Sequence, residues 1–207
     1  MRKTVVVDLD GTLFNTNTFV HYIIFVGKCA LKKLDILTAC SLFLFVTLRK
    51  VRIISTHERM KYYVLKCSLK YAQSEIMQKL VDILVKFENT TVVELMNNYR
   101  LKGYSIMLST AAPVAYAQIV ASRYGFDCFC ASEMPSTKDW KENVNEHKKD
   151  NTMNVLKKTD RELSVLLTDH YDDLPLLSMP KEENYLVNPT TKTERILKEN
   201  DIIYRLL

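Results

Sequence analysis

The chain has 207 residues, 47% of them hydrophobic, with only 4 glycines and 5 prolines. This length and composition indicate a globular protein with one core and a small accessory unit, and they exclude repeat and low-complexity chains. The formal net charge is +5, but residues 27–70 contain ten Lys or Arg against two acids. Two interpretations of this basic stretch stay open, a solvated helical face or attraction to an anionic substrate or lipid surface.

The cysteines are odd in number and lack paired CxxC spacing, which indicates neither a disulfide framework nor a zinc site. They are Cys29, Cys40, Cys67, Cys128 and Cys130. We expect them to stay reduced in a cytoplasm. The first residues enter a predicted strand at once and leave no room for a signal peptide, so the expected location is cytoplasmic. We expect no nucleic-acid partner.

Two carboxylates follow the first predicted strand. Val5–Val7 is a run of β-branched residues typical of a strand buried on both faces. Asp8 and Asp10 come at its carboxyl end, where open α/β sheets bind their ligands, and Gly11 allows a sharp turn. An aspartate can attack phosphorus while a second carboxyl transfers protons. Because ionised carboxylates only accept hydrogen bonds, a phosphate can approach the pair only with a cation, for which Mg²⁺ is the natural choice.

From residue 15 to about residue 88 the strand pattern gives way to helical periodicity. We predict four helices, over residues 18–27, 31–49, 55–70 and 74–87. Within the second, Ile36–Leu48 carries no charge and is bracketed by Lys32-Lys33 and Arg49-Lys50. It falls short of the ~20 residues that span a bilayer, so no transmembrane helix is predicted. We favour a helix buried in a bundle, with contact to a membrane surface as the alternative.

A second predicted strand ends on hydroxyl side chains. A helix over residues 92–102 precedes a strand over residues 105–110, which ends at Ser109 and Thr110. Ala111 then opens a predicted helix that has Pro113 in its first turn. A hydroxyl and free backbone N–H groups at a helix start can hold a phosphate, so Thr110 and Ala111 are candidate phosphate ligands.

A second acidic group follows the predicted strand Leu163–Leu167. Asp169, Asp172 and Asp173 stand just beyond it, and three carboxylates are costly to crowd together unless a cation shares them. The remaining predicted elements are a strand at 128–132, a loop or hairpin at 133–146, a helix at 150–158, an edge strand at 185–187 and a closing strand at 202–207.

These motifs resemble those of the haloacid dehalogenase superfamily. Its first motif is Asp-x-Asp-Gly-Thr-Leu, which residues 8–13 match at every position. Its fourth is Asp, three residues, Asp, then Leu-Pro-Leu-Leu, which Asp169 and Asp173 match. Its second ends a strand on Ser or Thr, and alignment on Pro113 makes Thr110 the match, with Ser109 its neighbour.

The resemblance implies a role for each acidic residue. Asp8 is the nucleophile, and Asp10 is the general acid and base. Asp8, Asp10 and Asp169 are the implied Mg²⁺ ligands, with Asp173 as an ordering residue behind them.

The superfamily's third motif is a lysine at a helix start, whose ammonium neutralises the nucleophile and the phosphate. Lys148 and Lys149 both qualify. We prefer Lys149, since it places Met153 and Leu156 one and two turns further along the helix. His170 stands where the family usually has a small residue, which leaves its role open.

Strands alternating with helices predict an α/β fold, a doubly wound parallel sheet with a small inserted helical cap. Residues 1–14 and 89–207 form the predicted core and residues 15–88 the cap, as in the phosphoserine-phosphatase-like branch. The resemblance implies a Mg²⁺-dependent phosphatase for a small phosphorylated metabolite. A lipid-phosphate phosphatase of the phosphatidylglycerophosphatase type fits the apolar, basic-flanked cap segment. A phosphomutase, a dehalogenase and a receiver-like phospho-aspartate domain are further alternatives, although receivers have no inserted cap.

Overall fold

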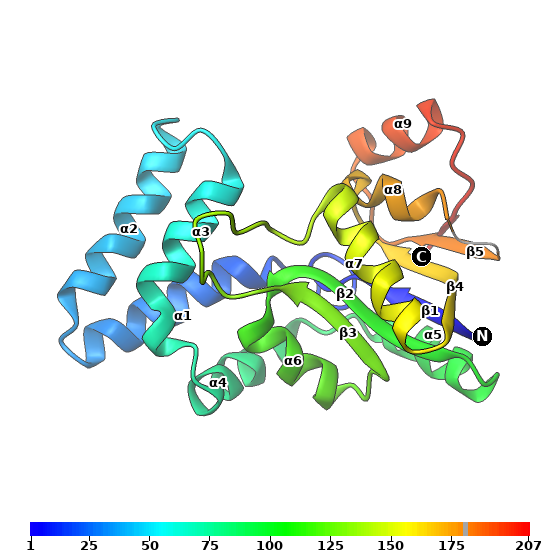
Figure 1. The fold of residues 1–207 in the computed structure, drawn as a ribbon, viewed down its shortest axis with the longest axis horizontal. Coiled ribbons are helices and arrows are strands. Elements are labelled where there is room, and N and C mark those ends of the chain that lie inside the picture. The colour runs from blue at the N-terminus through cyan, green and yellow to red at the C-terminus, as the bar shows by residue number, and fades with distance from the viewer. Residues whose placement is uncertain (180–181) are drawn as a thin grey trace.

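A parallel sheet runs through the computed structural model, which describes residues 1–179 and 182–207 (Figure 1). Within these residues the sheet has six strands in the order β3-β2-β1-β4-β5-β6, and all neighbours are parallel. The strands are β1 (Arg2–Val7), β2 (Ser105–Pro113), β3 (Cys128–Ser132), β4 (Arg161–Thr168), β5 (Glu183–Leu186) and β6 (Arg205–Leu206). The predicted α/β class and doubly wound parallel sheet are confirmed.

The central strand β1 explains where a ligand can bind. Val5, Val6 and Val7 are fully buried, because β1 is paired along both edges and covered on both faces. The chain runs from β1 outward to β2 and β3 and then crosses to β4, on the other side of β1. Doubly wound sheets bind ligands at such a switch point, beyond the carboxyl ends of the two strands. The site is therefore expected where Asp8 and Asp169 follow β1 and β4.

Helices cover both faces of the sheet. They are α5 (Thr90–Leu101), α6 (Val114–Arg123), α7 (Asn145–Lys158), α8 (Leu174–Leu177), which follows a 3-10 turn at Tyr171–Asp173, and α9 (Thr191–Glu199). Val5 and Val7 share a core with α5 and α6, whereas Val6 shares a core with α7, α8 and α9, as the alternation of strand side chains requires. The sequence analysis did not predict α9, although Thr190 caps it by accepting a hydrogen bond from the Thr193 amide.

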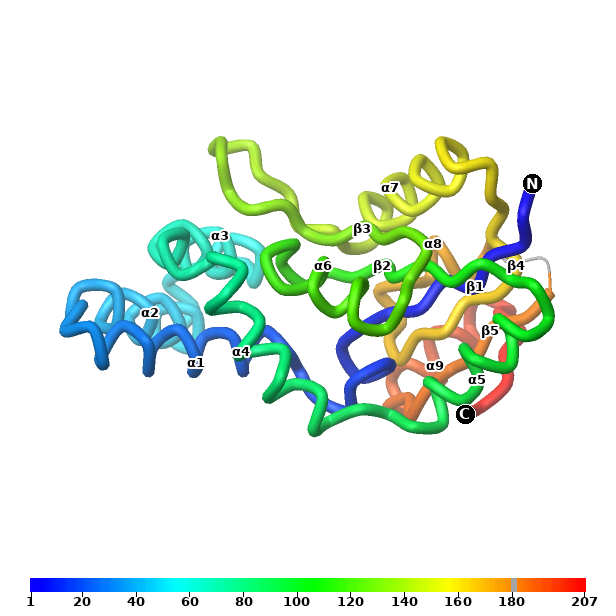
Figure 2. The backbone as a smooth tube through the Cα atoms, turned by 90° about the horizontal axis from the view of Figure 1, so that it is seen from below, coloured from blue at the N-terminus to red at the C-terminus, as the bar shows by residue number. Residues whose placement is uncertain are grey.

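Four further α-helices project from one end of the sheet (Figures 1 and 2). They are α1 (Thr18–Lys32), α2 (Ile36–Lys50), α3 (His57–Ser68) and α4 (Ser74–Leu84), with 3-10 helices at Leu69–Tyr71 and Val85–Phe87. We call α1 to α4 the cap helices. The predicted start of the second helix was wrong, because α1 continues to Lys32 and Leu34, at a φ of 56°, turns the chain before Asp35 caps α2. The division of the chain into core and cap at residues 14/15 and 88/89 stays a prediction.

The expectation that Ile36–Leu48 is buried was wrong. Of the residues in α2, only Thr38 and Leu42 are buried, whereas Phe43 is 76% and Leu37 is 80% exposed. The reason is that α2 packs against α1 and α3 on one side, whereas no other described helix or strand lies against its outer side (Figure 1). Among the described residues no helix is long and apolar enough to cross a membrane.

This exposure pattern predicts that truncation of two adjacent residues, Leu42 and Phe43, lowers stability by very different amounts. Leu42→Ala should lower the free energy of unfolding by about 2–5 kcal/mol, because it empties a buried position. Phe43→Ala should change it by less than about 0.5 kcal/mol, because its ring lies in solvent. Urea-induced unfolding followed by circular dichroism measures both. Equal losses in the two variants would contradict the orientation of α2.

Candidate active site

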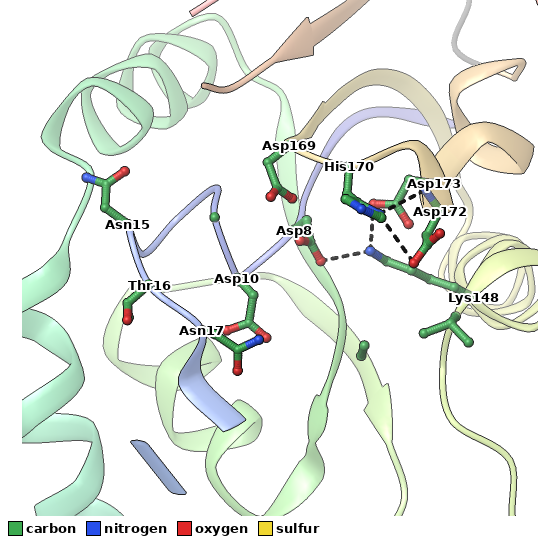
Figure 3. A pocket seen from close by; sticks show the side chains of 13 residues that line it. Asp8, Asp10, Asn15, Thr16, Asn17, Lys148, Asp169, His170, Asp172 and Asp173 are labelled. Atoms are coloured by element: carbon green, nitrogen blue, oxygen red, sulfur yellow. Dashed lines mark hydrogen bonds and ion pairs between the residues drawn. The ribbon is translucent and has the colours of Figure 1, made fainter. Parts of the chain in front are cut away.

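A pocket of about 490 Å³ opens at the carboxyl edge of the sheet (Figure 3). Four segments contribute to its lining. They are residues between Asp8 and Asn17 after β1, Ala111 in β2, Val144 and Lys148 around the start of α7, and Asp169, His170, Asp172 and Asp173 after β4. The structure therefore brings together the acidic residues that lie at separate strand ends in the sequence.

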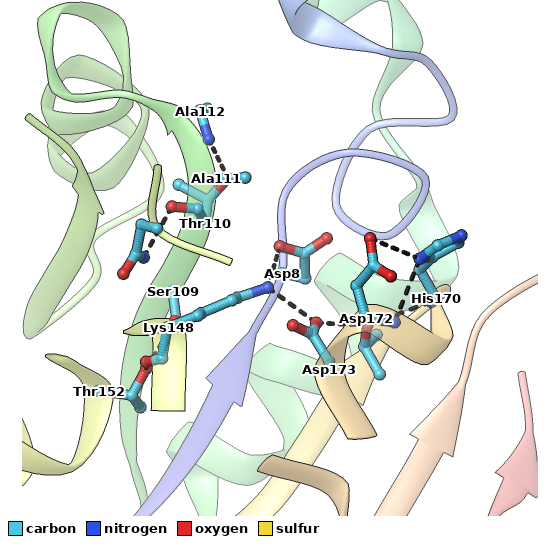
Figure 4. A network of polar contacts seen from close by, with 12 residues as sticks. Asp8, Ser109, Thr110, Ala111, Ala112, Lys148, Thr152, His170, Asp172 and Asp173 are labelled. Carbon is cyan, nitrogen blue, oxygen red and sulfur yellow. Dashed lines mark hydrogen bonds and ion pairs between the residues drawn. The ribbon is translucent and has the colours of Figure 1, made fainter. Parts of the chain in front are cut away.

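One ammonium group lies between two buried carboxylates in this pocket (Figure 4). Lys148 Nζ is 2.7 Å from Asp8 Oδ1 and 2.7 Å from Asp173 Oδ2. The Thr168 hydroxyl donates to the same Asp173 oxygen at 2.7 Å, and all four side chains are buried. Burial lowers the pKa of Lys148, but the two carboxylates outweigh burial and raise it above its ordinary value. The ammonium therefore stays charged in the pocket.

The structure corrects the choice of lysine. Helix α7 begins at Asn145, earlier than predicted, so Lys148 shares the buried face of the helix with Thr152, four residues on. The side chain of Lys149 is 29% exposed and pairs with Glu146 instead. Lys149 does not line the pocket, and Lys148 occupies the position expected of the third motif.

Asp169 packs against the turn that follows β1. Gly11 in that turn has a φ of +71°, and a Cβ on it would lie 2.2 Å from Asp169 Oδ2. Any side chain at residue 11 would therefore displace this carboxylate as well as strain the backbone. The glycine allows the carboxylate after β4 to approach the loop after β1.

Asp10 directs its side chain toward the cap helices. Its Oδ1 accepts a hydrogen bond of 2.5 Å from the amide of Thr18, the first residue of α1. Burial raises the pKa of the Asp10 carboxyl, although the hydrogen bonds from Thr18 oppose the shift. A raised carboxyl pKa at a pocket is suited to holding and releasing a proton.

The pocket carries more negative charge than Lys148 neutralises. Burial raises the pKa of Asp8 and of Asp169, and the nearby Asp173 adds to both shifts while Lys148 opposes them. Such an excess favours a bound cation. In the part of the chain that the structure describes, no three or more His, Cys, Asp or Glu side chains are arranged to hold a metal ion. The Asp10 side chain bonds the Thr18 amide, which leaves Asp8 and Asp169 as the two carboxylates open to a cation. The predicted Mg²⁺ ligands Asp8, Asp10 and Asp169 stay a prediction.

Of the two predicted phosphate ligands, Ala111 lines the pocket and Thr110 is fully buried behind it. The predicted helix start at Ala111 was wrong, because β2 continues to Pro113 and α6 begins only at Val114. Thr110 Oγ1 accepts a hydrogen bond of 3.0 Å from the Ala112 amide (Figure 4). Its hydroxyl hydrogen is the group left to donate.

His170 lines the same pocket but pairs with a neighbour in sequence. Its Nδ1 accepts a hydrogen bond of 3.2 Å from the Asp172 amide and lies 3.3 Å from the Asp172 carboxylate. The Asp172 carboxylate raises the pKa of His170. These contacts orient the imidazole toward Asp172.

The sequence of this chain matches the model of one protein family. The model of the haloacid dehalogenase-like hydrolases matches residues 5–178, which include every pocket residue named above. The chain belongs to the haloacid dehalogenase-like hydrolases.

Several solved structures resemble this hydrolase. A protein of unknown function from Bordetella pertussis Tohama I is 16% identical, with a TM-score of 0.78 over 100% of this chain and 98% of that chain. A probable phosphoserine phosphatase from Vibrio cholerae is 14% identical, with a TM-score of 0.67 over 93% of this chain and 58% of that chain. A phospho-aspartyl intermediate analogue of phosphoserine phosphatase is 13% identical, with a TM-score of 0.60 over 99% and 92%. At these identities the likeness shows the fold alone. No curated protein sequence matches the chain.

A buried ion pair joins the cap helices of this hydrolase to the wall of its pocket. Lys61 in α3 is only 2% exposed, and its Nζ donates to the Ala111 carbonyl at 2.7 Å and to Glu142 Oε1 at 2.5 Å. The Glu142 amide in turn donates to Glu58 Oε1 in α3 at 3.0 Å. The sequence analysis did not find this contact, because a lysine within a basic run carries no sign of burial. The pair fixes α3 to the residue that lines the pocket from β2.

This pair makes a stability prediction. Lys61→Met should lower the free energy of unfolding by about 3–5 kcal/mol, because it removes the buried ammonium that pairs with Glu142 and leaves that carboxylate only the more distant His57 Nδ1, at 3.7 Å. The double variant Lys61→Met/Glu142→Gln should recover part of the loss, because no unpaired charge remains. Chemical denaturation of the single and double variants measures the difference. Lys66→Met, at an exposed position of the same helix, is the matched control. A double variant no more stable than Lys61→Met would contradict the ion pair.

Proposed function

We propose that this hydrolase is a Mg²⁺-dependent phosphatase that cleaves phosphate monoesters through an aspartyl phosphate on Asp8. The observation that carries the proposal is the setting of Asp8, which is buried at the wall of the pocket with one oxygen 2.7 Å from Lys148 Nζ. A nucleophilic carboxylate needs a fixed orientation and positive charge beside the phosphoryl group. Lys148 supports both requirements.

In the first displacement, the Asp8 carboxylate forms a bond to phosphorus while the bond from phosphorus to the ester oxygen breaks. In the second, water attacks phosphorus, phosphate leaves and the Asp8 carboxylate is restored. The Lys148 ammonium keeps its charge through both steps and stabilises the phosphoryl oxygens. Asp173 accepts hydrogen bonds from Lys148 and from the Thr168 hydroxyl, and these contacts hold that ammonium in position.

Asp10 is the proposed acid and base. It lines the pocket two residues after Asp8, and burial raises its pKa, which favours the protonated form needed to protonate the leaving alkoxide. The resulting carboxylate can then take the proton of the attacking water. The hydrogen bond from the Thr18 amide orients the side chain for both transfers and connects it to the first turn of α1.

Asp8 and Asp169 are the residues that would hold the magnesium ion. Mg²⁺ in proteins commonly uses one or two carboxylates and completes its shell with water and substrate phosphate, so this pair of oxygen donors fits the ion. When bound, the ion offsets the negative charge that a phosphate brings toward the two carboxylates. Gly11 supports the site by leaving room for the Asp169 carboxylate.

The favoured substrate is a small phosphorylated metabolite of the phosphoserine type. Similarity in fold to proteins described as phosphoserine phosphatases supports this class. A lipid phosphate is the second candidate, supported by the exposed apolar residues of α2, Leu37 and Phe43 among them.

Phosphate release from a panel of sugar, amino-acid, nucleotide and lipid phosphates, with Mg²⁺ and with EDTA, tests the proposal. We expect hydrolysis of at least one ester that stops when the metal is chelated. Asp8→Asn should lower turnover by roughly 10³-fold or more with an unchanged circular dichroism spectrum, since an amide keeps the shape but is a poor nucleophile. Turnover that survives in Asp8→Asn would show that Asp8 is not the nucleophile.

Substitution of the two adjacent lysines should affect kcat very differently. Lys148→Ala should lower kcat by about 10²-fold or more, because it removes the positive charge beside the nucleophile. Lys149→Ala should stay within about twofold of the wild type, because its side chain pairs outside the pocket. Steady-state kinetics on one ester measures both, with circular dichroism to confirm folding. A greater loss in Lys149→Ala would assign the charge beside the nucleophile to Lys149 instead of Lys148.

Asp10→Asn should slow alkyl phosphates far more than aryl phosphates. A poor leaving group needs a proton in the transition state, whereas a phenolate leaves without one, so the ratio of the two rates should change by roughly 10²-fold or more. Comparing kcat for both ester types in wild type and variant gives that ratio. Equal losses for the two esters would show that Asp10 does not protonate the leaving group.

A further inference from the structure

The outer side of α2 is an exposed apolar surface. Leu37, Cys40, Phe43 and Leu44 are exposed there, with Leu37 at 80%, Phe43 at 76% and Leu44 at 51%. At about 100° per residue these four side chains fall within an arc of roughly 120°, opposite the buried Thr38 and Leu42. We call these four residues the outer face of α2. A run of exposed apolar side chains along one helix marks a contact surface.

Basic residues stand at both ends of this helix. Lys32 and Lys33 close α1 just before the turn into α2, and Lys50 and Arg52 lie at and beyond the end of α2. Within the residues described by the structure, none of these four takes part in an ion pair. The acid at the start of α2, Asp35, is already bonded to Lys70 at 2.7 Å. The four residues of the outer face are therefore apolar, and cations without an ion-pair partner among the described residues stand near both ends of α2.

We propose that the outer face of α2 docks on an anionic lipid surface. A helix with an apolar side and neighbouring Lys or Arg lies in the plane of a membrane, where its apolar side chains enter the acyl boundary and its cations meet lipid phosphates. With 15 residues, α2 is about 22 Å long, shorter than the ~30 Å core of a bilayer. It is therefore suited to lie on the membrane rather than to cross it.

The basic residues at the ends of α2 favour a lipid surface over a second copy of the chain as the partner of the outer face. In a symmetric dimer the same patch meets itself, so the cations of Lys32, Lys33, Lys50 and Arg52 would face an identical set. Like charges brought together across an interface oppose association. Anionic lipid headgroups complement these cations, and the apolar outer face complements the acyl chains.

The cap helices arrange this surface on the side of α2 away from the core. Phe45 is partly buried and stacks on Tyr63 of α3 with ring centroids 5.2 Å apart, and Lys61 of α3 is bonded to the Ala111 carbonyl. The buried side of α2 is thus held to the protein through α3. The outer face can therefore bind a membrane while these contacts stay intact.

Co-sedimentation of the full chain with vesicles tests the proposal. The vesicles are phosphatidylcholine alone or phosphatidylcholine with about 30% phosphatidylglycerol, each at low salt and at high salt. We expect binding to the anionic vesicles at low salt and a loss of at least about fivefold at high salt, because the charge attraction is screened. No binding to anionic vesicles at low salt would overturn the proposal.

Two sets of variants separate the apolar and the charged contributions. Phe43→Gln/Leu44→Gln should weaken partitioning by roughly tenfold or more, because it removes the inserting side chains. Lys32→Gln/Lys33→Gln should weaken it by at least about fivefold and reduce its dependence on salt. Matched controls are Leu101→Gln, a position 87% exposed in α5, and Lys157→Gln/Lys158→Gln at the end of α7. Losses in the controls as large as in the α2 variants would overturn the proposal.

The same samples distinguish a second copy as the occupant. Light scattering across a concentration series should give a monomer mass for wild type and for Phe43→Gln/Leu44→Gln alike. If the wild type is a dimer and this variant is a monomer, the outer face of α2 binds a second copy of the chain, and the membrane proposal is overturned. Because binding is measured without substrate, this test is independent of the proposed phosphatase activity, and a failure of either leaves the other standing.

Discussion

The Lys148 ammonium, held between Asp8 and Asp173 at 2.7 Å from each, is the contact on which the pocket depends. All three side chains are buried, so each charge has lost most of its hydration and none can be removed without leaving another uncompensated. The constraint extends to the architecture. Helix α7 must begin beside the ends of β1 and β4, and Thr152, one turn further on, bonds Ser109 of β2 at 2.7 Å. One helix thus ties together the three strands that supply the pocket.

The cap helices combine two opposite kinds of surface. Their inner side is fixed to the core by the buried pair of Lys61 and Glu142, and by the Thr18 amide that bonds Asp10. Their outer side exposes the apolar residues of α2 with cations at each end. Because α1 starts next to the pocket and leads directly to α2, the same insertion that orients the proposed acid also presents the proposed docking face.

The sheet and its acidic strand ends were predictable because both follow from local chemistry. A buried strand such as Val5–Val7 that stops on Asp8 has few other interpretations, and the same holds where β4 stops before Asp169. Of the two candidate lysines, the sequence favoured Lys149, whereas the structure places Lys148 in the pocket, and the difference has a physical reason. Helix α7 has Val144 at its N-cap position and no side-chain cap, so the usual sequence signal of a helix start is absent. The predicted inward face of the helix therefore contained Lys149 in place of Lys148. The orientation of α2 and the burial of Lys61 depend on tertiary packing, which an apolar run or a basic run does not encode.

Asp8 and Lys148 are 140 positions apart in the chain, and Asp173 lies a further 25 beyond. At about 5–20 residues per second on the ribosome, Asp8 is made on the order of ten seconds before Lys148, its ammonium partner. No N-terminal fragment that ends before α7 can assemble the pocket, whatever part of the sheet it has formed. The pocket can therefore form only after the ribosome has passed Asp173, so that ligand binding at this pocket reports on a chain that already contains α7 and the segment after β4.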